Sequence, residues 1–277
     1  MGSNGLGSDR TLSVLITGAG RGIGKRLAMG FAKAGGCIGL LGRNEAELDS
    51  TRLEIEDAGG IAMVLCADVC VFEQMTAATA AMTSEWGRID CLIANAGVQG
   101  PVGPFSSNSP ADWVDVLDVN VRGVMNACHA VLPQMVKRRS GKILAVSCAG
   151  ALTPRPGFAA YAASKAAVAR FIESLAEEVR DDNVQVNSML PGTAYTNMTD
   201  EILKASAVLP DAELELANRA RLTGGTPPER QLQLALFLAS ERSNHVTGKL
   251  IDVQDDWKRL ENDGVRPDVF TLRRHHR

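Results

Sequence analysis

The stretch 12–24, LSVLITGAGRGIG, decides the fold of this chain of 277 residues. Its first half is a continuous apolar run, and a glycine-rich turn then leads into a stretch of helical periodicity. Gly18 permits a sharp exit from a strand, Gly22 allows the backbone to approach a pyrophosphate, and Gly24 allows a helix to pack closely on a sheet. The free N–H groups and the dipole of such a helix attract an anion. We therefore predict a dinucleotide-binding turn, with an ordinary glycine-rich turn as the alternative.

The rest of the chain repeats this alternation of apolar runs and helical stretches, which is typical of βαβ units. The runs are apolar throughout, as expected when helices cover both faces of a parallel sheet. We predict an α/β fold: a single Rossmann-like domain with a doubly wound, seven-stranded parallel sheet and helices on both faces. The predicted strands are 13–17, 37–41, 62–66, 91–95, 142–147, 185–190 and 249–253, and the predicted helices are 22–33, 45–58, 72–86, 110–137, 158–180 and 227–239.

Composition limits the classes of partner. The chain has 29 basic and 32 acidic side chains and a formal net charge of −3, so it presents no field of one sign to nucleic acid or an anionic membrane. The longest apolar run, 61–67, is far shorter than the roughly 20 residues of a membrane helix. The cysteines form no C-x-x-C pair, which is typical of reduced thiols. We expect a cytoplasmic protein with no nucleic-acid or membrane partner.

The histidines argue against two further kinds of site. Two of the four, His275 and His276, lie at the end of the chain, and no H-E-x-x-H or Cys/His cluster occurs, so we expect no metal. The other two, His129 and His245, stand alone, and the sequence has no G-x-S-x-G elbow. A Ser-His-Asp hydrolase is therefore disfavoured.

The end of the second predicted strand bears on the choice of dinucleotide. A site for NAD usually places an acid there, but the chain reads LLGRN over 40–44. Arg43 suits the 2′-phosphate of NADP, and Arg21 in the glycine-rich turn could reach the same group. We predict NADP, with NAD less favoured; the alternative for Arg43 is a solvated charge at a helix start. Asp68 either holds the adenine edge or caps the next helix.

A candidate catalytic set lies in the second half of the chain. Tyr161 and Lys165 are four residues apart in a predicted helix and therefore share one of its faces. An ammonium group stabilises a phenolate, and would lower the phenol pKa from about 10 toward the working range of an acid/base catalyst. Ser147 ends the fifth predicted strand, where open α/β sheets place their ligand crevice. The alternative is a surface Tyr–Lys pair.

Taken together, these motifs resemble those of the short-chain dehydrogenase/reductase family, of an NADP-preferring type with an atypical C-terminal tail. The matching pieces follow one another in the family's order between residues 10 and 253. They are T-G-x-x-x-G-x-G at 17–24, N-A-G at 95–97, Asn120, Ser147, Y-x-x-x-K at 161–165 and P-G-x-x-x-T at 191–196.

The resemblance implies a role for each matching residue. Tyr161 would exchange a proton with the substrate oxygen, and Ser147 would hydrogen-bond the same oxygen. Lys165 would lower the pKa of Tyr161 and bind the nicotinamide ribose, and Asn120 would hold a kinked helix and a water of the proton relay. The predicted cofactor-binding residues are Gly18, Arg21, Gly22, Ile23, Gly24, Arg43, Asp68, Val69, Asn95, Ala96, Gly97, Tyr161, Lys165, Pro191, Gly192 and Thr196.

The predicted activity is an NAD(P)-dependent oxidoreduction that interconverts a carbonyl and a secondary alcohol. Hydride would move between C4 of the nicotinamide and the carbinol carbon, and the hydroxyls of Tyr161 and Ser147 would meet the charge that develops on oxygen. Two alternatives stay open: a redox-neutral, epimerase-type reaction on the same fold, and a non-catalytic dinucleotide sensor.

We divide the chain into a flexible N-terminus at 1–10, a Rossmann-fold domain at 11–253 and a C-terminal extension at 254–277. Within the domain, the segment 193–226 is polar at its start, weakly helical after Asp200 and ends in two glycines. A segment of this length usually covers a site, so we expect a substrate lid. Candidate substrate-pocket residues outside and inside it are Ala149, Pro154, Phe158, Tyr195 and Met198.

The C-terminal extension departs from the family pattern. The last strand usually ends in V-D-G-G, but this chain reads IDVQDDW over 251–257 and continues for about twenty residues more. The tail would cover the active site or dock on a neighbouring subunit, with Trp257 and Phe270 as apolar anchors; a partly ordered extension is the alternative. Apolar residues on more than one face of the helices 110–137 and 158–180, and the family resemblance, predict a homodimer or homotetramer.

Overall fold

The computed structural model describes residues 11–261, 266 and 268–272 of the chain. The predicted flexible N-terminus, 1–10, lies outside the described residues. Within them, the strands form one seven-stranded sheet in the order β3-β2-β1-β4-β5-β6-β7, in which every neighbouring pair is parallel. The fold prediction is therefore confirmed. The strands are β1 (Ser13–Thr17), β2 (Cys37–Gly42), β3 (Ile61–Cys66), β4 (Cys91–Ala94), β5 (Gly141–Val146), β6 (Val184–Leu190) and β7 (Leu250–Asp252).

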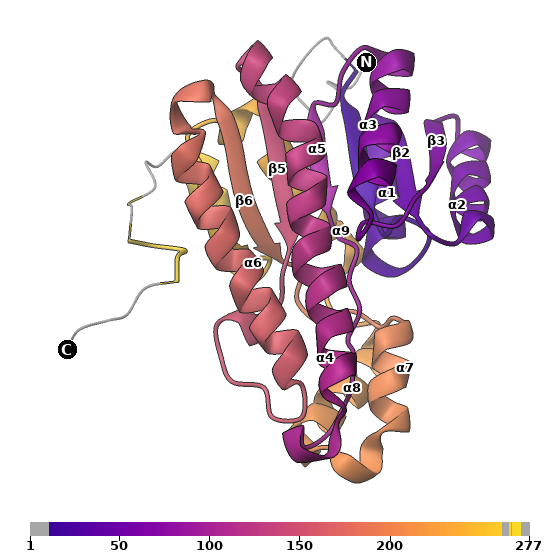
Figure 1. Ribbon diagram of the computed structural model, residues 1–277, viewed down its shortest axis with the longest axis vertical. Coiled ribbons are helices and arrows are strands. Elements are labelled where there is room, and N and C mark those ends of the chain that lie inside the picture. Colours follow the sequence, from indigo (N-terminus) through magenta and orange to yellow (C-terminus); the bar gives the residue numbers. More distant parts are fainter. Residues whose placement is uncertain (1–10, 262–265, 267, 273–277) are drawn as a thin grey trace.

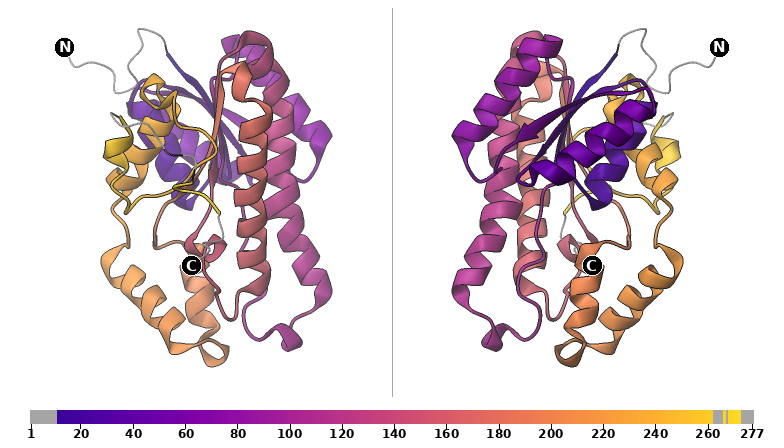
Figure 2. Two further views of the ribbon diagram at one scale, coloured as in Figure 1. Left: turned by 90° about the vertical axis from the view of Figure 1, so that its left-hand side faces the viewer. Right: turned by 90° about the vertical axis from the view of Figure 1, so that its right-hand side faces the viewer.

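Helices cover both faces of this sheet (Figures 1 and 2). One face carries α1 (Gly22–Lys33), α2 (Glu45–Asp57) and α9 (Pro228–Ala239), whose buried side chains share one core cluster. The other face carries α3 (Phe72–Trp86), α5 (Gly123–Arg138) and α6 (Ala159–Glu178), which share the second large cluster. From β1 the strands β2 and β3 follow toward one edge of the sheet, and from β4 the strands β5, β6 and β7 follow toward the other edge. The strand order therefore reverses between β1 and β4. Open sheets of this kind have their ligand crevice where the order reverses.

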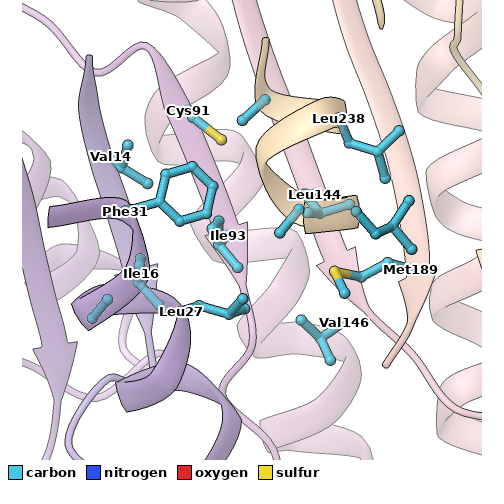
Figure 3. Close-up of a cluster of buried hydrophobic side chains, with 14 of the residues drawn as sticks. Val14, Ile16, Leu27, Phe31, Cys91, Ile93, Leu144, Val146, Met189 and Leu238 are labelled. Carbon is cyan, nitrogen blue, oxygen red and sulfur yellow. The ribbon is translucent and has the colours of Figure 1, made fainter. Parts of the chain in front are cut away.

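The two cores explain why the strands are apolar throughout. Val14 and Ile16 of β1 face the first cluster, together with Ile93 of β4, whereas Leu15 and Leu92 face the second. Side chains of a strand alternate between the two faces, and both faces are buried here. Figure 3 shows the first cluster, in which the ring of Phe31 lies against β1 and β4. The continuous apolar pattern of β1 is thus explained by its place in the middle of the sheet, where helices cover both faces.

The predicted helix 110–137 is wrong as a single regular helix. The structure has α4 (Pro110–Leu117), a π-helical turn η2 (Asp118–Arg122) and then α5. A π turn contains one residue more than an α turn and therefore widens the helix locally. Such turns are frequent at functional sites. Asn120 lies in this turn and is fully buried. The bend implied for this helix therefore has a defined cause.

The segment 193–226 is more regular than predicted. It contains α7 (Asn197–Lys204), a short turn at Ser206–Val208 and α8 (Asp211–Thr223). Figure 1 shows α7 and α8 beyond the carboxyl ends of β5 and β6, at the same end of the molecule as α4. The segment therefore lies at the end of the sheet where a crevice is expected.

The described part of the C-terminal extension packs on its own chain. The indole of Trp257 stacks on Phe237 with ring centroids 5.4 Å apart. Further on, the N–H of Leu250 donates to the carbonyl of Phe270 at 2.7 Å, and Leu272 packs beside Ala151. Trp257 and Phe270 thus both contact their own domain. In the part of the chain that the structure describes, every helix is too short or too polar to span a bilayer.

We expect the Phe31→Ala variant to lose about 3–5 kcal/mol of unfolding free energy, because it leaves a cavity between β1, β4 and α9. The side chain of Phe31 is fully buried. Chemical denaturation followed by circular dichroism measures the change. Leu53→Ala on α2 is the control, because Leu53 is 51% exposed. Equal losses in the two variants would contradict the packing described here.

Candidate active site

A cleft of about 1530 Å³ opens along the carboxyl ends of the strands. Its walls come from the glycine-rich turn, the segments that follow β2 to β6, and the 193–226 segment. All but one of the predicted cofactor-binding residues line it, as do Ser147, Tyr161 and Lys165. The two predicted site residues that lie behind the wall are Gly24 and Asn120. Topology therefore brings together residues that are far apart in the sequence.

The glycine-rich turn has the geometry of an anion site. Gly18 and Gly22 adopt left-handed backbone conformations, with φ of 67° and 58°. A Cβ on Gly24 would lie 2.2 Å from the carbonyl oxygen of Gly18, so close packing of α1 requires glycine there. The first turn of α1 has no side-chain cap and no acidic residue. Its backbone N–H groups are thus available to a pyrophosphate.

Asn95 supports this turn. Its side-chain amide donates to the carbonyls of Thr17 and Gly18 at 2.9 and 3.2 Å. The hydroxyl of Thr17 in turn accepts from the backbone N–H groups of Asn95 and Ala96, each at 3.0 Å. These bonds end β4 at Ala94, one residue earlier than predicted. The Asn95 side chain of the N-A-G motif and the Thr17 hydroxyl therefore fasten the turn to the end of β4, a role that the sequence did not indicate.

Two arginines lie at the end of the cleft next to β2 and β3. Arg21 pairs with Glu47 at 3.6 Å and Arg43 with Asp68 at 3.9 Å. The arginine side chains are 63% and 67% exposed, so these pairs contribute little stability and exchange easily. The other carboxylate oxygen of Asp68 accepts from the N–H of Cys70 at 2.9 Å, just before α3. This bond closes a local turn and is not a helix cap, because the N-cap of α3 is Val71 and no side chain caps that helix.

Ser147, Tyr161 and Lys165 all line the cleft. Ser147 follows β5, is 3% exposed, and its Oγ has no hydrogen-bond partner among the described residues. Nζ of Lys165 lies 5.6 Å from the ring centroid of Tyr161 and donates to the carbonyl of Val146 at 2.9 Å. A buried hydroxyl without a partner and a phenol in the wall of one cleft are suited to receive a substrate oxygen.

Asn120, which is buried outside the cleft wall, connects the loop after β4 with the start of α6. Its Oδ1 accepts from the N–H of Val98 at 2.8 Å, and its Nδ2 donates to the carbonyl of Val98 at 2.9 Å. Nδ2 also donates to the hydroxyl of Ser164 at 3.0 Å, and that hydroxyl donates to the carbonyl of Tyr161 at 2.7 Å. The π turn thus holds the loop after β4 and the first turns of α6 in register.

Electrostatics around Tyr161 differs from the sequence-based expectation. Burial and then the Cys148 side chain raise the pKa of Tyr161, and Arg155 lowers it. Burial also lowers the pKa of Lys165. The pKa of the phenol therefore lies above its ordinary value, because burial outweighs the effect of Arg155. That Lys165 lowers this pKa stays a prediction.

Two of the predicted substrate-pocket residues do not line the cleft. Phe158 is fully buried, and its ring lies 4.0 Å below the guanidinium of Arg155. Tyr195 turns outward and its hydroxyl donates to Asp200 at 2.8 Å. The other three, Ala149, Pro154 and Met198, do line it. Periodicity and proximity in sequence could not give the direction of these side chains.

The cleft also contains an ion pair that no sequence motif predicts. Arg155, on the loop before α6, donates three hydrogen bonds to Glu213 of α8: Nε to Oε1 at 3.0 Å, Nε to Oε2 at 3.1 Å and Nη2 to Oε2 at 2.9 Å. The two side chains are 19% and 14% exposed. The pair lies outside every motif, and only its place in the predicted lid segment pointed to Glu213.

Comparison with known proteins gives one consistent result. The family model described as short chain dehydrogenase matches residues 13–207. The oxidoreductase UcpA of Salmonella typhimurium is 37% identical over 239 residues, covering 85% of this chain and 90% of that protein. Among solved structures, a 7α-hydroxysteroid dehydrogenase complexed with NADH and 7-oxo glycochenodeoxycholic acid is similar, with a TM-score of 0.79, 27% identity, and 91% and 96% of the two chains covered. A gluconate 5-dehydrogenase from Burkholderia cenocepacia in complex with NADP and tartrate gives a TM-score of 0.76 at 30% identity, covering 87% and 92%.

We expect Asn120→Ala to lower the unfolding free energy by about 1–3 kcal/mol, because it leaves the partly buried N–H and carbonyl of Val98 without their partner. Ser164→Ala, which keeps both bonds between Asn120 and Val98, should lose less. Chemical denaturation measures both. A larger loss for Ser164→Ala than for Asn120→Ala would contradict the bridging role of Asn120.

Proposed function

Because the chain belongs to the short-chain dehydrogenase/reductase family of NAD(P)-dependent oxidoreductases, we propose that it interconverts a ketone and a secondary alcohol with Tyr161 as the acid/base. The observation that carries the proposal is that Ser147, Tyr161 and Lys165 line the same cleft as the uncapped start of helix α1. A dinucleotide site and an acid/base pair in one cleft suit hydride transfer.

The residues present fit the dinucleotide. The turn 18–24 and the N-terminus of α1 would hold its pyrophosphate, and Pro191, Gly192 and Thr196 would border its nicotinamide end. When bound, the nicotinamide supplies or accepts the hydride. Ser147 would donate its free hydroxyl to the substrate oxygen, and Tyr161 would give a proton to that oxygen or take one from it. Lys165 would bind the nicotinamide ribose and hold a positive charge beside the phenol.

We further propose that the cofactor is NADP. Arg21 and Arg43 both line the cleft at the end of β2, where the chain offers Gly42 and no acid. Both guanidinium groups are mostly exposed and only loosely paired, so a 2′-phosphate could replace Glu47 and Asp68 as their partner. Solved relatives bind NADH in one case and NADP in another, so the choice rests on these two arginines.

We also propose that the protein is cytoplasmic and forms a homodimer or homotetramer. Exposed apolar side chains on α4 and α5 support the assembly: Val114 is 56% exposed, Leu117 41% and Met125 46%. Exposed apolar groups on neighbouring helices are typical of an interface between subunits. We propose in addition that residues 11–253 form the domain and that its segment 193–226 is a lid. Residues of 193–226 that line the cleft support the lid.

We expect Tyr161→Phe to reduce reduction of carbonyl compounds by about 100-fold or more, because it removes the proton donor. Binding of NADPH, followed by energy transfer from tryptophan, should be unchanged. The chain has two tyrosines, so Tyr195→Phe is the matched control. Undiminished turnover in Tyr161→Phe would contradict the proposed chemistry, and loss of NADPH binding would show a structural defect instead.

We expect Arg43→Ala to weaken NADPH binding by about tenfold, because one charge-assisted hydrogen bond to the 2′-phosphate is lost. Affinity for NADH, which lacks this phosphate, should change little. Parallel fluorescence titrations with the two nucleotides give the ratio. Arg52→Ala on the neighbouring helix α2 is the control, since Arg52 pairs with Asp49 and Glu56 outside the cleft. An unchanged preference in Arg43→Ala would contradict the assignment.

A further inference from the structure

Arg155 is a fixed cation next to the proposed acid/base. Its guanidinium lies 4.0 Å from the ring centroid of Phe158 and 6.0 Å from that of Tyr161. Phe158 is fully buried, so the platform below Arg155 cannot move away. Arg155 thus lies at about the same distance from the phenol ring as Nζ of Lys165, which is 5.6 Å away. Two cations, one of them outside the Y-x-x-x-K motif, face Tyr161.

The charge of Arg155 is controlled from across the cleft. Glu213 belongs to α8 and binds the guanidinium through both of its carboxylate oxygens. Both side chains are largely buried, so their interaction is stronger than that of the exposed pairs at the other end of the cleft. An anion in contact with Arg155 cancels most of the field that the guanidinium exerts on Tyr161. This cancellation lasts only while α8 stays in place.

Among the described residues, few charged or titratable groups act on Tyr161. They are Cys148 from the loop after β5, Arg155 from the same loop, and Lys165 from α6, with Glu213 behind Arg155. Burial and Cys148 favour the neutral phenol, whereas Arg155 favours the phenolate. The 193–226 segment therefore affects the ionisation of Tyr161 through the ion pair of Glu213 with Arg155.

We propose that Arg155 is a positioning residue that stabilises the ionised form of Tyr161, and that Glu213 on α8 sets the strength of this effect. The inference rests on the proposed function, because it concerns the proposed acid/base. With the ion pair made, Tyr161 keeps its proton and is ready to donate it to a carbonyl oxygen. With α8 displaced, Arg155 acts on Tyr161 without its counter-ion, and the phenolate is ready to accept a proton from an alcohol.

The test is a titration of Tyr161 that needs no substrate. Protein is made with 3,5-difluorotyrosine, whose phenol is more acidic than that of tyrosine, in a Tyr195→Phe background that leaves position 161 as the single label. Fluorine NMR then follows its ionisation against pH. We expect Glu213→Gln to lower the pKa by about one unit and Arg155→Met to raise it by about one unit. In the double variant, which removes both charges, the pKa should lie close to that of the protein with Arg155 and Glu213 intact.

The opposite signs separate this proposal from a purely structural role. If the ion pair only held α8 closed, breaking it from either side would admit water and lower the pKa in both single variants. A lowered or unchanged pKa in Arg155→Met therefore overturns the proposal. Arg155→Gln, which retains hydrogen bonding to Glu213, gives the same readout if the Met variant is poorly folded. Glu215→Gln removes a charge from an exposed position of the same helix and should leave the pKa unchanged.

The same variants connect the titration to turnover. In alcohol oxidation, where Tyr161 must be ionised to accept a proton, the rise of kcat with pH should move to lower pH in Glu213→Gln and to higher pH in Arg155→Met. Failure of the proposed function is detected separately, by absent NADPH binding or by full activity of Tyr161→Phe. Opposed pKa shifts in a protein that fails those tests would support this inference alone.

Discussion

The close approach of the glycine-rich turn to the end of β4 is the constraint on which the rest of the site depends. A Cβ on Gly18 would lie 2.9 Å from Cα of Ala96, and one on Gly24 would lie 2.2 Å from the carbonyl oxygen of Gly18. Only glycine allows α1 to start this near the sheet, and this start directs its free N–H groups into the crevice between β1 and β4. Asn95 then fastens the turn with two hydrogen bonds.

A second buried network holds the part of the cleft around Tyr161 in register with this turn. Asn120 forms hydrogen bonds with Val98 in the loop after β4 and with Ser164 in α6. A displacement of the loop would therefore break or strain the bond to α6, and a displacement of α6 would do the same to the bonds to the loop. The π turn makes this possible, because it places a fully buried amide where a regular helix would present a different side chain. Fully satisfied buried networks give rigidity of this kind. Tyr161 therefore has a backbone position that depends on β4 as well as on its own helix.

Much of the fold could be predicted from sequence because its signals are local. The apolar run and turn at 12–24, the repeated strands and the spacing of Tyr161 and Lys165 all act within one or two elements. What the sequence could not give depends on contacts between distant elements. The π turn at Asn120 is stabilised by Val98 and Ser164, and the pair of Arg155 and Glu213 joins residues 58 positions apart. Neither leaves a periodic pattern, and the amphipathic helices α7 and α8 are obscured by the polar composition of their segment.

The three arginines of the cleft divide it into two electrostatic regimes. Among the described residues each of them faces an acid: Arg21 with Glu47, Arg43 with Asp68 and Arg155 with Glu213. The first two pairs are exposed and loose, so a nucleotide phosphate can take the place of the acid at little cost. The third is bidentate and largely buried, and removing its carboxylate would leave a charge without a partner in a poorly hydrated place. Arg21 and Arg43 can therefore exchange their counter-ions with each ligand that arrives, whereas the counter-ion of Arg155 moves only when α8 moves.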